Sequence, residues 1–149
     1  MREIKTISRA EAISAIARAR EAVCSPPDLQ LLLEDCHAAS VHEALLCKYA
    51  GVTNGFLSQI YEAISGARAE VIGEPEFRFR CPCCHRQTLD EIFDPEQGTG
   101  WDICDHCGWE DDSTTDETQR SGCNRGSMSE YRARMLARPN YYNRDKWRA

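Results

Sequence analysis

Cysteine spacing is the strongest chemical signal in this chain of 149 residues. Two Cys-x-x-Cys pairs, Cys81 with Cys84 and Cys104 with Cys107, are separated by nineteen residues. Two intervening residues let both thiolates of a tight turn point at one centre, and two facing turns complete the tetrahedral shell that zinc prefers. The sequence therefore predicts one structural zinc ion held by these four cysteines. Four thiolates leave no coordination position for water, so the predicted metal is not catalytic.

Cys83 lies between the first two predicted ligands and is left over. It is a buried thiol, a thiol that exchanges with a ligand, or a redox-active one. A redox role for the paired cysteines is the main alternative to zinc, but it usually needs a single pair in a βαβ setting, which this segment lacks. His85 and His106 are substitute ligands. The chain has no paired nucleophile and base and no phosphate-binding glycine loop, so we predict no enzymatic activity.

The segments around the cysteine pairs are those of a zinc ribbon. Residues 77–80 (FRFR) alternate as a strand does before the first turn, and residues 88–93 and 101–103 are expected to be the strands that leave it and enter the second. Gly108 follows the second pair, where a glycine lets a backbone N–H approach a metal-bound sulfur. His85 takes that position after the first pair.

The preceding part of the chain, residues 1–73, is predicted to be helical. Ser8 begins a capping box, Pro26 and Pro27 stand where a helix begins, and Gly66 ends a helix expected from about Asn54 to Ser65. A further helix is expected between Ser40 and Gly51. The predicted fold is α+β: a small helical bundle at 1–73, followed at 74–149 by a zinc-ribbon-like domain with a basic C-terminal helix and tail.

Residues 46–60 resemble a helix-turn-helix. The expected turn is Ala50–Val52, the expected buried positions are Leu46, Leu57 and Ile60, and the residues able to read bases are Thr53, Asn54, Ser58 and Gln59. Phosphate contacts from Lys and Arg dominate DNA affinity, yet residues 1–73 carry seven bases against nine acids. Two helices joined by a glycine turn are also a common packing unit. We prefer packing, and a DNA- or RNA-binding regulator is the alternative.

Several motifs together resemble the bacterial cysteine-rich CPCC domain over roughly residues 79–135. They are CPCC at 81–84, TLD at 88–90, ICDHCGWEDD at 103–112 and GCNRGSMSEYRARM downstream. His85 stands where that family usually has glycine. The resemblance implies a small zinc-binding domain with no reaction attached to it, of a kind associated with bacterial immunity proteins that neutralise toxins.

Charge is distributed in blocks along the second half. Residues 74–117 carry thirteen acids against three arginines, and residues 125–149 carry seven bases against two acids. Trp109 with Glu110, Asp111 and Asp112 forms the predicted partner-binding surface, since exposed aromatics often carry binding energy. The alternative, which we prefer for Trp109, is a tryptophan that covers the zinc turn next to a solvated loop. The basic tail, with its tyrosines and Trp147, either binds single-stranded nucleic acid or, as we prefer, folds back onto the acidic module.

These features favour a binding protein over an enzyme or a regulator. The chain has neither an apolar run long enough to cross a bilayer nor a signal-peptide pattern, so a cytosolic location without membrane contact is expected. A formal charge of −6 repels nucleic acid and attracts basic proteins. We therefore predict a non-catalytic protein that binds a basic protein partner, such as a nuclease toxin.

Overall fold

The computed structural model describes residues 3–97, 100–137 and 145–149. These residues form five helices and four short strands, which confirms the predicted α+β class. The chain divides into an N-terminal unit, residues 1–76, and a C-terminal unit, residues 77–149. Among the described residues, no helix combines the length and the apolar character needed to cross a membrane.

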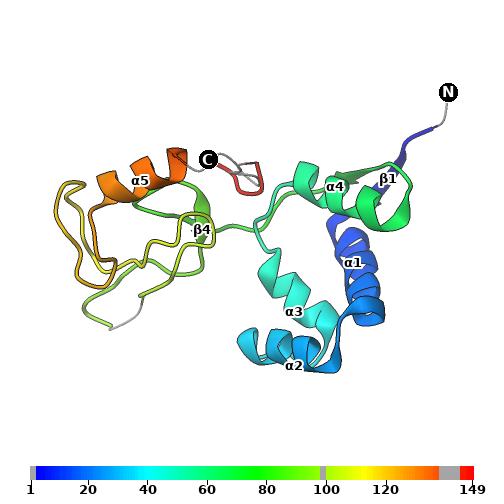
Figure 1. Cartoon of the computed structure of the whole chain (residues 1–149). Coiled ribbons are helices and arrows are strands. Elements are labelled where there is room, and N and C mark those ends of the chain that lie inside the picture. The colour runs from blue at the N-terminus through cyan, green and yellow to red at the C-terminus, as the bar shows by residue number, and fades with distance from the viewer. Residues whose placement is uncertain (1–2, 98–99, 138–144) are drawn as a thin grey trace. The chain divides into compact units, whose positions relative to one another are not determined.

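Four helices of the N-terminal unit begin and end where local signals place them: α1 (Arg9–Val23), α2 (Pro26–Asp35), α3 (Val41–Lys48) and α4 (Asn54–Ser65) (Figure 1). Ser8 and Glu11 form the predicted capping box of α1, and Ser40 accepts a hydrogen bond from the Glu43 amide of α3. Gly66 ends α4 with a φ of 70°, a left-handed conformation that glycine adopts without steric cost. Helix α1 packs against α3 and α4, and it supplies the buried Ile13 and Ile16.

A two-stranded parallel sheet, which the sequence patterns did not predict, completes this unit. Strand β1 (Lys5–Ser8) pairs with β2 (Ala69–Ile72), and Ile7 is opposite Val71. Parallel strands need a long crossover connection, and α1 to α4 provide it. Ile7 and Val71 are both buried, whereas their neighbours along each strand are exposed. The sheet therefore covers the helices with one face only, and each strand is too short to give a strong periodic signal.

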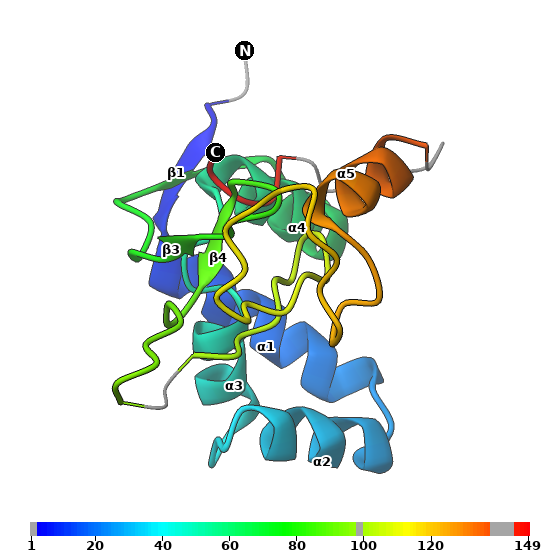
Figure 2. The same cartoon turned by 90° about the vertical axis from the view of Figure 1, so that its left-hand side faces the viewer.

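The C-terminal unit contains little regular structure beyond a hairpin and one helix. Strand β3 (Phe79–Arg80) pairs antiparallel with β4 (Gln87–Leu89), as Figure 2 shows, and Ser127 caps α5 (Met128–Leu136). The strands expected at 88–93 and 101–103 are wrong in extent. Strand β4 ends at Leu89, and the second segment contributes an isolated bridge between Ile103 and Glu110. Asp102 explains the early end of β4: its carboxylate accepts hydrogen bonds from the Asp90 and Glu91 amides, at 2.8 and 2.9 Å.

The C-terminal residues fold back onto the β3–β4 hairpin, which confirms the preferred interpretation of the tail. Trp147 is only 2% exposed, and the Gln87 amide donates to the Arg148 carbonyl at 2.8 Å. The buried guanidinium of Arg78 lies 5.5 Å from the Trp147 ring centre and forms an ion pair with Asp90. Tyr141 and Tyr142, which were also expected to be buried, lie outside the described residues.

Candidate metal centre

Two similar turns present the four predicted ligands. In the first, the His85 amide donates to the Cys81 carbonyl at 2.9 Å; in the second, the Gly108 amide donates to the Cys104 carbonyl at the same distance. His85 has a φ of 64° and Gly108 a φ of 81°. The first turn thus has the backbone geometry of the second, although a histidine pays a steric cost there that glycine avoids.

The four sulfurs converge on a single point. The Sγ atoms of Cys81, Cys84, Cys104 and Cys107 all lie within 4.8 Å of one another. The Cys81–Cys107 and Cys84–Cys104 pairs are separated by 3.6 and 3.7 Å. A tetrahedral ion with metal–sulfur bonds of about 2.3 Å places its sulfurs about 3.8 Å apart, so this cluster fits such an ion. The ligand set therefore forms one site that could hold a metal ion.

The surroundings favour negative charge on the Cys104 sulfur in particular, because hydrogen bonding to Cys104 raises the pKa of Cys81, Cys84 and Cys107 above the usual range. The backbone amides of Cys83, His106 and Trp109 point at Cys81, Cys104 and Cys107 respectively, over 3.3 to 3.4 Å. The neighbouring thiols of Cys107, Cys81 and Cys84 hold the pKa of Cys104 well below its usual range, and the Thr88 hydroxyl, 3.0 Å away, contributes in the same direction. Hydrogen bonds to a thiolate stabilise its charged form, which is the form that binds metals.

Apolar side chains wall the cluster, and Trp109 is the largest of them. It is fully buried with Leu89 and Met128, and its ring meets that of Tyr131 edge to face at a centroid distance of 5.2 Å. The prediction that Trp109 is an exposed anchor for a partner is therefore wrong. Burial of its indole against α5 and the metal turns shields the sulfurs from water instead.

Of the three acids after Trp109, Asp111 is buried, while Glu110 and Asp112 are half-buried. Asp111 is only 7% exposed, and its carboxylate accepts the Phe93 amide at 2.8 Å. Asn124 pairs with both the amide and the carbonyl of Glu110, at 2.8 and 2.9 Å. Asp111 therefore connects loops of the unit, and its assignment to a partner surface is wrong, whereas Asn124 holds the backbone of the half-buried Glu110, whose assignment stays a prediction.

Asp112 also makes internal contacts. Its carboxylate accepts the Ser121 hydroxyl at 2.6 Å. Partial burial pushes its pKa upward, but hydrogen bonds from Ser121 and Thr114 outweigh burial and leave the pKa below its usual value.

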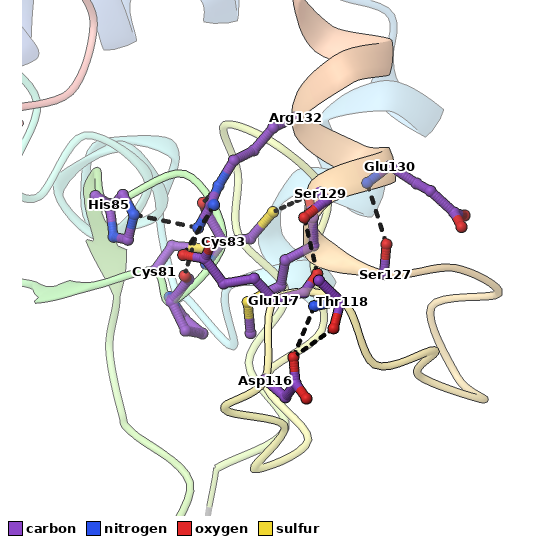
Figure 3. Close-up of polar contacts among 12 residues, drawn as sticks. Cys81, Cys83, His85, Asp116, Glu117, Thr118, Ser127, Ser129, Glu130 and Arg132 are labelled. Atoms are coloured by element: carbon purple, nitrogen blue, oxygen red, sulfur yellow. Dashed lines mark hydrogen bonds and ion pairs between the residues drawn. The ribbon is translucent and has the colours of Figure 1, made fainter.

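Arg132 binds the first turn through hydrogen bonds to its carbonyls, a role that the sequence did not predict. From α5 it donates to the carbonyls of Cys83 and Pro82, and it forms a 3.0 Å ion pair with Glu117 (Figure 3). These contacts restrain the turn that contains Cys81 and Cys84. The only sequence signal for them is the excess of bases after residue 125, which does not single out one arginine.

An exposed surface lies elsewhere in the same unit, where Trp101 and Ile103 are 50% and 63% exposed. Glu91 is adjacent to it, because its carboxylate accepts the Gly100 amide at 3.3 Å, and the exposed Asp90 precedes Glu91. Phe93 supports Trp101 from one side, with an edge-to-face contact at 5.1 Å. We call Asp90, Glu91, Trp101 and Ile103 the acidic Trp101 surface.

The helix-turn-helix-like segment uses its polar groups inside the N-terminal unit. Asn54 accepts a hydrogen bond from the buried Arg9 at 2.6 Å and donates to the Gly73 carbonyl, while Ser58 accepts the Val71 amide at 3.0 Å. Thr53 caps α4. The predicted burial of Leu46 is wrong, since it is 40% exposed and Leu45 is buried in its place. These side chains would have to break internal contacts before reading bases.

Comparison with known proteins found a family match, and it lies within the C-terminal unit. Residues 79–141 match the model of the Cysteine-rich CPCC family. No curated protein and no solved structure matches the chain. The match begins at β3 and includes both metal turns and all of α5. Over residues 79–141, the C-terminal unit is thus similar to the cysteine-rich CPCC domain.

Proposed function

We propose that this chain is a non-catalytic, cytosolic zinc protein that acts by binding another protein. Four cysteine sulfurs within 4.8 Å of one another are a ligand set typical of structural zinc, because thiolates are soft donors and four of them fill its coordination shell. When bound, zinc supplies a crosslink between the two turns. The chain's own residues then hold a surface in place and perform no reaction.

The acidic Trp101 surface is the observation that carries the binding proposal. It combines a half-exposed indole with an exposed isoleucine and the exposed carboxylate of Glu91, next to the Asp90 carboxylate that is paired with Arg78. All of these residues lie on loops close to the metal turns in sequence. Aromatic side chains supply much of the binding energy at protein interfaces, and carboxylates around them attract basic partners. We infer a basic protein partner, and an immunity role in which this chain masks a basic toxin such as a nuclease.

Affinity capture tests the partner class. Tagged, zinc-loaded full-length protein is mixed at low salt with host lysate treated with nuclease, and bound proteins are eluted with salt and identified by mass spectrometry. A single basic protein in stoichiometric amount supports the proposal. Recovery of nucleic acid without protein from an untreated lysate would replace it with the regulator alternative.

Two variants then locate the interface on whichever partner is captured. Trp101→Ala should weaken binding by roughly 30-fold, the scale of an interface hot spot. Glu91→Lys should slow association at low salt, because it reverses a charge that steers a basic partner. Matched controls are Leu136→Ala, a still more exposed apolar side chain, and Glu70→Lys at an exposed position of strand β2. Wild-type affinity in both test variants would refute this surface.

A further inference from the structure

The acidic Trp101 surface holds its indole at the surface on a constrained backbone. Of the three tryptophans in the chain, Trp109 and Trp147 are buried, whereas Trp101 is 50% exposed. Its φ is 66°, in the left-handed region, where a bulky side chain is an outlier. Glycine adopts this conformation without steric cost, yet the position is occupied by the largest side chain. The loop therefore keeps an exposed indole where the backbone alone would favour glycine.

Close contact with a second loop fixes the position of this indole. Gly100, which precedes Trp101, has a φ of 108°, and a Cβ atom there would lie 2.5 Å from the Phe93 Cα atom. The absence of a side chain at Gly100 thus lets the two loops approach. The Phe93 and Trp101 rings then meet at 87°, and the buried Asp111 carboxylate holds the Phe93 amide. A side chain restrained in this way loses little conformational entropy when it binds.

The electrostatic environment of the indole is strongly negative. Residues 87–112 contain nine acids and no lysine or arginine. Two of the acids near the indole already have strong donors: Asp102 accepts two backbone amides, at 2.8 and 2.9 Å, and Asp90 is paired with Arg78. Glu91 is exposed and accepts the backbone amide of the residue before Trp101 through one oxygen, at 3.3 Å. A carboxylate has about four acceptor positions, so Glu91 retains capacity for a cation.

An exposed indole next to such a carboxylate suits a guanidinium better than an ammonium. A cation is attracted to the face of a tryptophan ring at distances up to about 6 Å from the ring centre. The planar guanidinium of arginine stacks on an aromatic ring and can also donate two parallel hydrogen bonds to a carboxylate. The ammonium of lysine is compact and strongly hydrated, and it offers neither the plane nor the paired donors.

We propose that the acidic Trp101 surface recognises an arginine side chain of its protein partner, whose guanidinium stacks on the Trp101 indole and pairs with the Glu91 carboxylate. The inference rests on the proposed protein-binding function and names the side chain that this surface recognises. The surrounding acids attract any basic protein, whereas Trp101 and Glu91 distinguish arginine from lysine.

The test compares two labelled peptides of equal charge, hexa-arginine and hexalysine, titrated at low salt into zinc-loaded full-length protein. Fluorescence anisotropy of the label gives the two affinities. Because the net charge of the peptides is the same, a difference in affinity reports stacking and paired hydrogen bonds. Hexa-arginine should bind about five-fold more tightly, the scale of an exposed cation–π contact. Unlabelled hexa-arginine should also protect tryptophan fluorescence from acrylamide, since Trp101 is the exposed tryptophan.

Three variants assign the preference to individual side chains. Trp101→Leu keeps an apolar side chain but removes the aromatic ring, and it should bind the two peptides with equal affinity. Glu91→Gln should weaken the binding of hexa-arginine more than that of hexalysine. Glu96→Gln removes one charge from another exposed acid of the same segment and is the matched control. It should weaken both peptides by the same factor and preserve the preference for arginine.

The outcomes separate this inference from the proposed function. Equal affinities of the two peptides for the wild type, or a preference for arginine that survives Trp101→Leu, would overturn arginine recognition. If a captured partner still loses affinity in Trp101→Ala, the binding surface stands without that recognition. A preference for arginine that depends on Trp101, with no protein captured, would overturn the proposed partner and support the arginine site. If Trp101→Leu does not fold, Glu91→Gln and the acrylamide measurement decide.

Discussion

Metal removal should unfold the C-terminal unit and leave the N-terminal unit folded. The large side chains that are almost fully buried in the described C-terminal unit are few: Leu89, Trp109, Met128 and Trp147. Three of them, all but Trp147, belong to the cluster that packs around the metal cysteines, so the core and the metal site are one structure. The described core of the N-terminal unit contains no residue of the metal cluster, and it should not respond to the metal.

The expected magnitude is large compared with domain stability. Structural zinc contributes about 10–16 kcal/mol at neutral pH, whereas a whole domain is typically stable by about 5–15 kcal/mol. The metal-free C-terminal unit should therefore be unfolded. Divided over four ligands, the same figure assigns about 3 kcal/mol to each thiolate, so Cys84→Ser should weaken zinc binding on the order of a hundredfold.

Hydrogen exchange read by mass spectrometry, with and without a strong chelator, measures this directly. The informative amides are those of Cys81, Cys104 and Gln87, which donate to the carbonyls of Arg86, Trp109 and Arg148. They should lose protection on chelation, while amides of α1 and α4 keep theirs. Unchanged protection across residues 77–149 after the metal is removed would refute the reasoning. Cys123→Ser should retain wild-type zinc affinity and serves as the control for Cys84→Ser.

Three further predictions concern substitutions at His85 and Gly108, at Arg9 and at Glu76. Both His85 and Gly108 have positive φ, which favours glycine. His85→Gly should therefore raise the stability of the zinc-loaded protein in thermal unfolding by up to about 1 kcal/mol, and Gly108→Ala should lower it by about 1 kcal/mol. Equal effects of the same sign would contradict this reasoning. Arg9→Ala should cost about 3 kcal/mol in chemical denaturation of the N-terminal unit, because the carbonyls of that unit and Glu76 lose a buried donor. Partial burial raises the pKa of Glu76, but Arg9 and the Gly51 amide outweigh it and hold the pKa below its usual value. The ionised Glu76 carboxylate therefore stabilises the folded protein at pH values above the usual glutamate pKa, and this stabilisation is lost as the pH falls through the lower pKa of the folded state. Glu76→Gln should therefore make the free energy of unfolding less dependent on pH on the acidic side.

Local rules explain what the sequence determined. The Cys-x-x-Cys spacing selects ligands because both thiols of such a pair belong to one tight turn, and the two pairs do converge. Capping at Ser8 and Ser40 depends on residues three positions apart, and both caps are present. The cluster of four cysteines, the helix boundaries and the α+β class could therefore be predicted without knowledge of which segments meet.

Exposure was decided by the tertiary structure alone. Trp109 packs against Tyr131 of α5, and the buried carboxylate of Asp111 accepts a hydrogen bond from the Phe93 amide. In both cases the contacting residue belongs to a segment that is distant in the sequence. The β1–β2 pair likewise joins two strands that are separated by four helices in the sequence. An aromatic residue among acids has the same local pattern whether it faces water or a core, since burial depends on contacts between segments that the local pattern does not specify.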